Sequence, residues 1–172
     1  MSLIAGSEEV RMSMTGTLAE IELTDHSKLS VVQDGALRPL IQMLSDGDLE
    51  KKKVAVKCLL QLSSLPQNGL LMLEEGAVRP LFEILYRHSL QLPALCEQVA
   101  ETIMNLSSAT TSQEPDAEHF PILESEDDIF KFFALVSLTG PETKRSILRA
   151  LLALCEPPSG LGIRTKLRQV SL

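Results

Sequence analysis

The side chains best suited to metal binding or nucleophilic chemistry in this chain are its histidines and cysteines. The sequence of 172 residues contains three of each, namely His26, His88, His119, Cys58, Cys96 and Cys155. None of them has the short spacing of a zinc-ligand motif, so we predict no metal site and expect the histidines at the surface. Cys58 and Cys155 fall within apolar helical stripes, which favours buried thiols in a reducing compartment over a disulfide framework.

Other short motifs offer little chemistry. The sequence has no G-x-S-x-G elbow, P-loop or dinucleotide fingerprint, so we predict no catalytic site and no cofactor. The acidic run Glu124–Asp128 lacks the alternating ligands and central glycine of a calcium loop, and favourable charge at a helix N-terminus explains it better. The triplet Lys51–Lys53 is either a basic binding patch or, as we favour, a solvated face. The stretch Ser107–Ser112 is either a phosphorylation target or, as we favour, a plain flexible loop.

Composition excludes several classes of function. The net charge of −7 argues against general nucleic-acid binding, which needs a cationic surface. No stretch is long and apolar enough to span a membrane, and no secretory signal is recognisable, so we predict a cytoplasmic protein with the nucleus as a second location. Apolar residues make up 44% of the chain and aromatic residues only 3%, so Leu, Ala and Val must build a helical core.

The sequence contains an internal repeat, and we expect the helices of this repeat to position any binding site. The sequence Gly-Ala-Leu-Arg-Pro-Leu at 35–40 returns as Gly-Ala-Val-Arg-Pro-Leu at 76–81, which is 41 residues later. Helical repeats of about 40–47 residues are typical of armadillo and HEAT solenoids. Because Gly35 and Gly76 recur with the repeat, we interpret them as helix terminators and not as phosphate-binding glycines.

Apolar spacing predicts three helices in each repeat. In the first repeat the predicted helices are Asp25–Gln33, Ala36–Leu44 and Leu49–Ser63. In the second repeat they are a short helix at Asn68–Glu75, a second helix with its apolar stripe over Val78–Leu85, and a third that begins near Pro93. A polar loop is expected from Ser107 to His119.

The predicted organisation is a single all-α segment over residues 1–172. It comprises a partial repeat at 8–23, repeats at 25–65 and 66–108, a polar loop at 109–121, a degenerate repeat at 122–155, and a loop with the start of a further helix at 156–172. Neither end carries the polar capping repeat that native solenoids use, so we expect a fragment or one segment of a longer array.

These residues resemble the armadillo repeat family. Val31–Leu65 and Leu71–Ser108 each show a short helix, Gly-Ala, Pro-Leu in a second helix and a long third helix that ends in Leu-Ser. The long Ser/Thr-rich insert further resembles the armadillo arrays of plant U-box ubiquitin ligases, although no U-box is visible. The resemblance implies a right-handed α-solenoid of three-helix repeats whose third helices line a groove for an extended peptide.

The resemblance also implies which residues face that groove. The family's groove asparagine corresponds to Asn105, and Gln61 occupies the same position in the preceding repeat. One turn earlier on the same face are Glu101 and Lys57, and Arg149 corresponds to them in the degenerate unit. A side-chain amide can pair with both the N–H and the C=O of a peptide, although an asparagine near a helix end can equally satisfy backbone groups of its own chain.

Three functional hypotheses follow. We favour a non-catalytic protein-interaction module that binds a peptide partner along the third-helix groove. The alternatives are the substrate-recruiting armadillo portion of a larger U-box E3 ubiquitin ligase and a purely structural spacer. Nuclear-import adaptors of this family hold basic signals with tryptophans, and the absence of Trp argues against that role.

Overall fold

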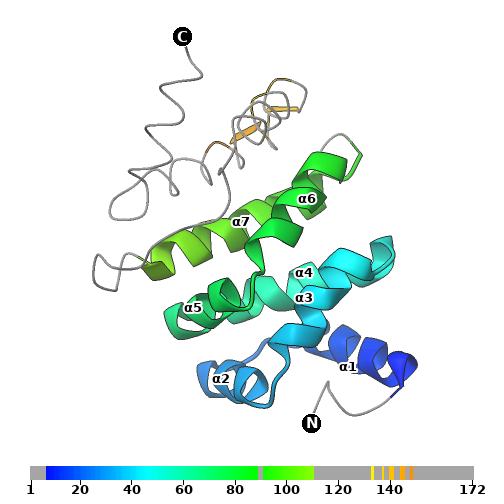
Figure 1. The fold of residues 1–172 in the computed structure, drawn as a ribbon, viewed down its shortest axis with the longest axis vertical. Helices are drawn as coiled ribbons and strands as arrows, with labels where there is room; N and C mark the ends of the chain where they lie inside the picture. The colour runs from blue at the N-terminus through cyan, green and yellow to red at the C-terminus, as the bar shows by residue number, and fades with distance from the viewer. Residues whose placement is uncertain are drawn as a thin grey trace.

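The structure is a computed structural model, and it describes residues 7–88, residues 91–110 and a few single positions between 133 and 148. The described part of the chain folds into α-helices, which in order are α1 (Glu8–Glu20), α2 (Asp25–Gln33), α3 (Leu37–Asp46), α4 (Leu49–Ser63), α5 (Pro66–Glu74), α6 (Val78–His88) and α7 (Pro93–Thr110). Figure 1 shows their stacking. The predicted Glu124–Asp128 cap, Arg149, Cys155 and residues 156–172 lie outside the described residues, as does most of the predicted degenerate repeat at 122–155.

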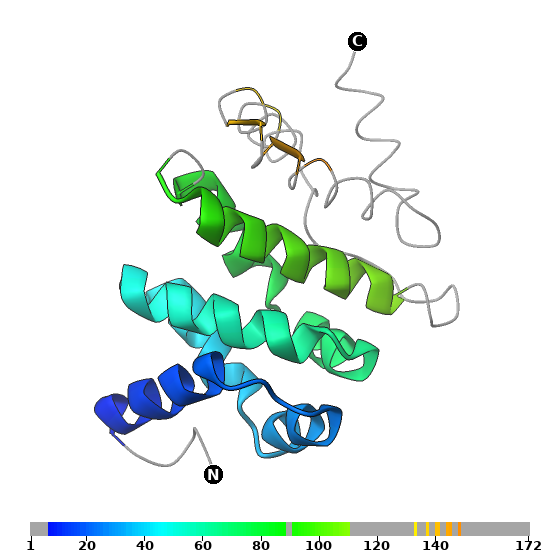
Figure 2. The same ribbon diagram turned by 180° about the vertical axis from the view of Figure 1, so that it is seen from behind.

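The helices stack in two layers. In one layer α4 packs between α1 and α7, and Figure 2 shows these three long helices side by side. On the other side α3 packs against α6, and α2 packs against α5. Helices α2, α3 and α4 therefore have the same arrangement as α5, α6 and α7, and α1 takes the place of a third helix before them.

Two glycines end the first helix of each triplet. Gly35 and Gly76 have φ angles of 88° and 76°, in the left-handed region that glycine adopts at least cost. After Gly35, the N–H of Ala36 donates to the carbonyl of Val31 at 3.3 Å; after Gly76, Ala77 donates to Met72 at 3.0 Å. These bonds complete a Schellman motif in each triplet and confirm the prediction that both glycines are helix terminators.

Helix α7 is longer than predicted. It continues to Thr110, so the prediction that a polar loop begins at Ser107 was wrong for the first four residues. Burial explains the difference, because Leu106 and Ala109 are fully buried. A Cβ placed on Gly69 of α5 would lie 2.9 Å from the Cβ of Ala109, which shows how closely α5 approaches this last turn.

The core is almost entirely aliphatic. The predicted stripes of the second helices are buried, and the largest fully buried side chains of the described residues are Leu40, Leu44, Leu59, Leu62, Met72, Leu81, Ile84, Leu85, Ile103 and Leu106. The buried residues of the stacked helices form one continuous core cluster. In the part of the chain that the structure describes, no helix is long and apolar enough to cross a bilayer.

Candidate functional site

A groove of about 610 Å³ runs across the layer of long helices. Its walls come from α1, α4, the residues just before α7 and the start of α7, and its lining residues are Gly16, Ala19, Glu20, Lys53, Val54, Lys57, Gln91, Leu92, Pro93, Ala94, Leu95 and Gln98. A groove that crosses three stacked helices can hold an extended chain, because successive helices present side chains at regular intervals along it.

The three consecutive lysines of α4 point to three different sides of the helix. Lys51 lines a cavity between α1 and α3, Lys52 lines a hollow between α3 and α6, and Lys53 lines the groove. Successive helical residues are about 100° apart, so a triplet is spread around the helix. The three lysines therefore form no continuous basic patch, and each remains partly exposed.

Lys57 is the predicted site residue that lines the groove. Its Nζ lies 2.8 Å from Oε1 of Glu20, so an ion pair joins α4 to α1 within the groove. Lys53, one turn earlier, pairs with Glu50 at 2.8 Å. Glu101, the predicted counterpart of Lys57 on α7, is exposed and is not among the lining residues.

The side chain of Gln61 forms hydrogen bonds with backbone groups at the C-terminal end of α1. Its Nε2 donates to the carbonyl of Leu18 at 3.2 Å and to that of Ile21 at 3.0 Å, and its Oε1 accepts from the N–H of Leu23 at 3.3 Å. The last carbonyls of a helix have no partner within the helix, and the Gln61 amide supplies one here. Both polar ends of the side chain are therefore occupied inside the chain.

Asn105 repeats this relationship one unit further on. Its Nδ2 donates to Oγ of Ser63 at 3.0 Å, and Ser63 lies at the last turn of α4. Gln61 of α4 thus contacts the end of α1, and Asn105 of α7 contacts the end of α4. The two amides hold successive long helices together, and neither lines the groove.

The sequence reasoning overlooked most of the groove. Gly16, Val54 and Leu92–Leu95 line it without belonging to any recognised motif. The available signal was Gly16, because a glycine inside a helix costs stability and calls for a reason. Arg149, the remaining predicted site residue, lies outside the described residues.

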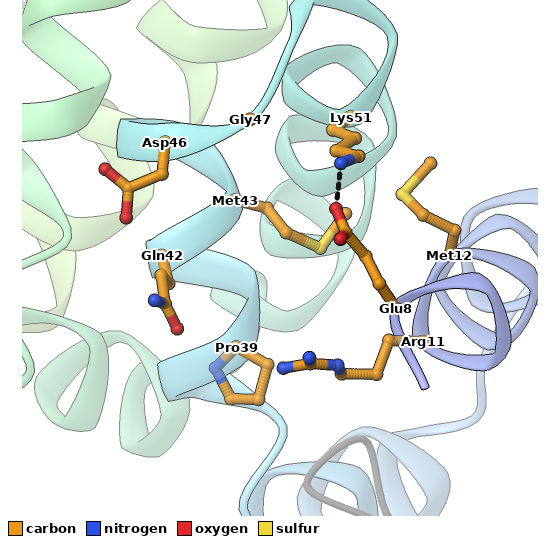
Figure 3. A pocket seen from close by; sticks show the side chains of 9 residues that line it. All are labelled: Glu8, Arg11, Met12, Pro39, Gln42, Met43, Asp46, Gly47 and Lys51. Atoms are coloured by element: carbon orange, nitrogen blue, oxygen red, sulfur yellow. Dashed lines mark hydrogen bonds and ion pairs between the residues drawn. The ribbon is translucent and has the colours of Figure 1, made fainter. Parts of the chain in front are cut away.

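A second, smaller cavity of about 220 Å³ lies between α1, α3 and α4. Figure 3 shows Glu8 of α1 facing Lys51 of α4, with which it forms an ion pair, and the thioether of Met43 close by. The Lys51 ammonium, through its hydrogen bond and charge, lowers the pKa of the Glu8 carboxyl.

Met43 is half-buried beside this cavity, whereas Ile84, at the same position of α6, is covered by α3. Among the described residues, no helix packs on this side of α3 as α3 packs on α6, and this leaves room for the cavity.

Titratable groups in the described residues show no arrangement suited to catalysis. Cys58 and Cys96 are free and buried, and burial raises the pKa of the Cys58 thiol to about 12 and that of Cys96 to about 11. The burial of Cys58 confirms the prediction for that residue, and a protonated thiol is a poor nucleophile. Burial also lowers the pKa of His88, with Lys52 and Arg87 nearby. Within the described ranges, no three His, Cys, Asp or Glu side chains gather as metal ligands.

The helix triplets and the groove define an all-α, right-handed solenoid of armadillo-type three-helix repeats, as predicted. The fold is similar to a crystal structure of computationally designed armadillo repeat proteins for modular peptide recognition. The TM-score is 0.65 at 16% sequence identity, over 98% of this chain and 66% of that one.

Two plant proteins are similar in sequence. U-box domain-containing protein 43 of Arabidopsis thaliana is 28% identical over 163 residues, which is 92% of this chain and 20% of the relative. U-box domain-containing protein 44 of the same plant is 27% identical over 157 residues, 91% of this chain and 19% of the relative. This chain therefore spans about a fifth of the length of these relatives. No protein-family model matches the sequence.

Proposed function

We propose that this chain is a non-catalytic protein-interaction module that binds an extended peptide across its long helices. The observation that carries the proposal is the groove over α1, α4 and α7, which Lys57 lines. Asn105, Gln61, Glu101 and Arg149 stay predictions as peptide contacts. Because the amides of Gln61 and Asn105 already bond within the chain, a peptide would have to displace these bonds to use them.

The comparisons support a binding role at a coarser level. The armadillo structure of similar fold was designed for modular peptide recognition, and this chain shares its fold. We propose peptide binding for this chain as well, because it has a groove of its own across α1, α4 and α7. A cytoplasmic location, with the nucleus as a second one, stays a prediction of the sequence.

Selection of peptides tests the proposal. The purified chain is used to select from a phage library of random twelve-residue peptides, and enriched peptides are synthesised and titrated by fluorescence polarisation. Lys57→Ala should weaken the binding of enriched peptides, whereas Gln33→Ala, an exposed change on α2, should not. A library that yields no peptide with measurable affinity would leave the structural spacer as the better hypothesis.

A second candidate rests on the two Arabidopsis relatives. Because both are U-box domain-containing proteins, we propose as an alternative that this chain recruits substrates for a larger U-box ubiquitin ligase. The test is an immunoblot of the endogenous product, followed by a ubiquitin-transfer assay on it. A product that contains a U-box and transfers ubiquitin to a protein bound by this chain would support the ligase role. A product near 18.9 kDa would remove it.

A further inference from the structure

We infer that the groove across α1, α4 and α7 selects an extended peptide in which an acidic residue stands beside an aliphatic one. This inference rests on the proposed function and adds the chemical class of the ligand. It is carried by three features of the lining: the two lysines on one face of α4, the apolar wall beside them, and the open backbone of α1 at Gly16.

The groove presents two lysines although the whole chain carries a net charge of −7. Its charged lining residues are Glu20, Lys53 and Lys57, and Glu50, which pairs with Lys53 at 2.8 Å, does not line the groove. Lys53 and Lys57 are four residues apart and therefore share a face of α4. Two ammonium groups one turn apart form a site for a carboxylate, and a basic peptide would meet the same repulsion twice.

The ion pairs of Lys53 and Lys57 with glutamates leave both ammonium groups accessible to a ligand. Lys57 pairs with Glu20 and Lys53 with Glu50, and the two lysine side chains are 42% and 39% exposed. Exposed ion pairs contribute little net free energy, so a peptide carboxylate can join or replace the glutamate at small cost. The internal pairs keep the two ammonium groups at the groove in the unbound chain.

An apolar wall lies beside the lysines. Ala19 of α1, Val54 of α4, Leu92 just before α7 and Leu95 in its first turn line the groove together. Leu95 is 5% exposed and holds the wall in place from the core side, whereas Leu92 is only partly buried. A wall of small and aliphatic side chains fits a Leu, Ile or Val side chain and gives an aromatic ring no stacking partner.

Gly16 gives a peptide backbone access to α1. A Cβ added at Gly16 would have no atom within 4 Å, so no close packing inside the chain requires a glycine there. A glycine within a strand or helix surface allows another backbone to approach closely. Gly16 therefore opens the groove beside Ala19 and Glu20, where the peptide main chain would pass.

The first experiment separates this inference from the function on which it rests. Random twelve-residue peptides on phage are selected on the whole chain, and their sequences are then compared. Enrichment of Asp or Glu next to Leu, Ile or Val is the expected result. Enriched peptides without that pair would overturn the inference and leave the peptide-binding function standing. A selection that enriches nothing would overturn both.

The second experiment assigns the preference to the lysines. A fluorescein-labelled peptide with a central Asp-Leu pair is titrated against the chain, together with the matched Asn-Leu, Lys-Leu and Asp-Ser peptides. The Asp-Leu peptide should bind about tenfold more tightly than Asn-Leu, the size expected for a lost charge-assisted contact. Equal affinity of the Asp-Leu and Lys-Leu peptides would overturn the inference.

Variants of α4 and α1 complete the test. Lys53→Gln with Lys57→Gln should remove the preference for Asp over Asn, whereas Lys52→Gln, the same change on the α3–α6 side of the helix, should leave it intact. Gly16→Ala should weaken all four peptides without loss of helical circular dichroism. A preference that survives the double lysine substitution in a folded chain would overturn the assignment.

Discussion

The N–H of Leu23, in the connection between α1 and α2, donates a hydrogen bond of 3.3 Å to Oε1 of Gln61 in α4. The same side chain donates to the carbonyl of Ile21 at 3.0 Å. One amide from α4 thus holds both sides of the turn that follows α1. Because α1 forms one wall of the groove, the position of that wall depends on Gln61.

Replacement of Gln61 should loosen α1. In Gln61→Ala the carbonyls at the end of α1 and the N–H of Leu23 lose their partner, and we expect a loss of about 1–2 kcal/mol in the free energy of unfolding. Urea unfolding measures the loss, and hydrogen exchange should locate it in α1. The exposed control Gln33→Ala should change stability by less than about 0.5 kcal/mol. Equal exchange of α1 in both variants would contradict the role given to Gln61.

Gly16→Ala should stabilise the fold while it harms binding. Alanine is favoured over glycine inside a helix by about 0.5–1 kcal/mol, and the new Cβ meets no atom within 4 Å. We expect a higher midpoint of thermal unfolding together with weaker peptide binding. Opposite effects on stability and affinity separate a groove residue from a packing residue. A variant that is less stable than the parent chain would show that α1 needs the glycine for its own packing.

Gly76→Ala should destabilise the fold by about 1 kcal/mol, although the new methyl group also meets no atom within 4 Å. The reason is its φ of 76°, which an L-residue with a side chain adopts only with strain. Chemical unfolding of Gly16→Ala and Gly76→Ala side by side is the measurement. Changes of the same sign would argue against the assignment of Gly76 to the left-handed position.

Alkaline pH should weaken the fold through Cys58 and Cys96, the two buried thiols of the described residues. Burial raises the pKa of Cys58 from 9.0 to about 12 and that of Cys96 to about 11. A pKa that is higher in the folded state than in the unfolded state contributes stability below pH 9, and this contribution is lost as the pH rises toward 11 and 12. Unfolding in urea between pH 7 and pH 11 should show this fall.

The matched control for the pH series is the double variant Cys58→Ala with Cys96→Ala. Its stability should fall less steeply above pH 9, because the two buried thiols no longer contribute to the pH dependence. In the parent chain at pH 8, a thiol reagent should leave Cys58 and Cys96 unmodified until the chain unfolds. Parallel pH profiles of the two proteins would contradict the shifted thiol pKa values.

Local physics made much of the fold predictable. The recurrence of Gly-Ala and Pro-Leu marked the repeat, and apolar spacing predicted α2 and α4 with the bounds that the structure has. These features can be predicted from the sequence, because a left-handed glycine and an apolar helical stripe depend on residues only a few positions apart. The extension of α7 to Thr110 could not be predicted from local sequence, because it depends on the burial of Ala109 against α5, about forty residues earlier in the chain.

The sequence by itself determined the class of fold, the repeat and the buried thiols, since each follows from local pattern and composition. Only the tertiary structure decided which side chains form the groove. The helical step sets the direction of each lysine around α4, but the helices packed beside α4 decide what it faces, so Lys53 and Lys57 face the groove while Lys51 and Lys52 face other hollows. The same packing engaged the amide of Gln61 with α1 and brought Gly16 and Leu92 together from distant parts of the chain.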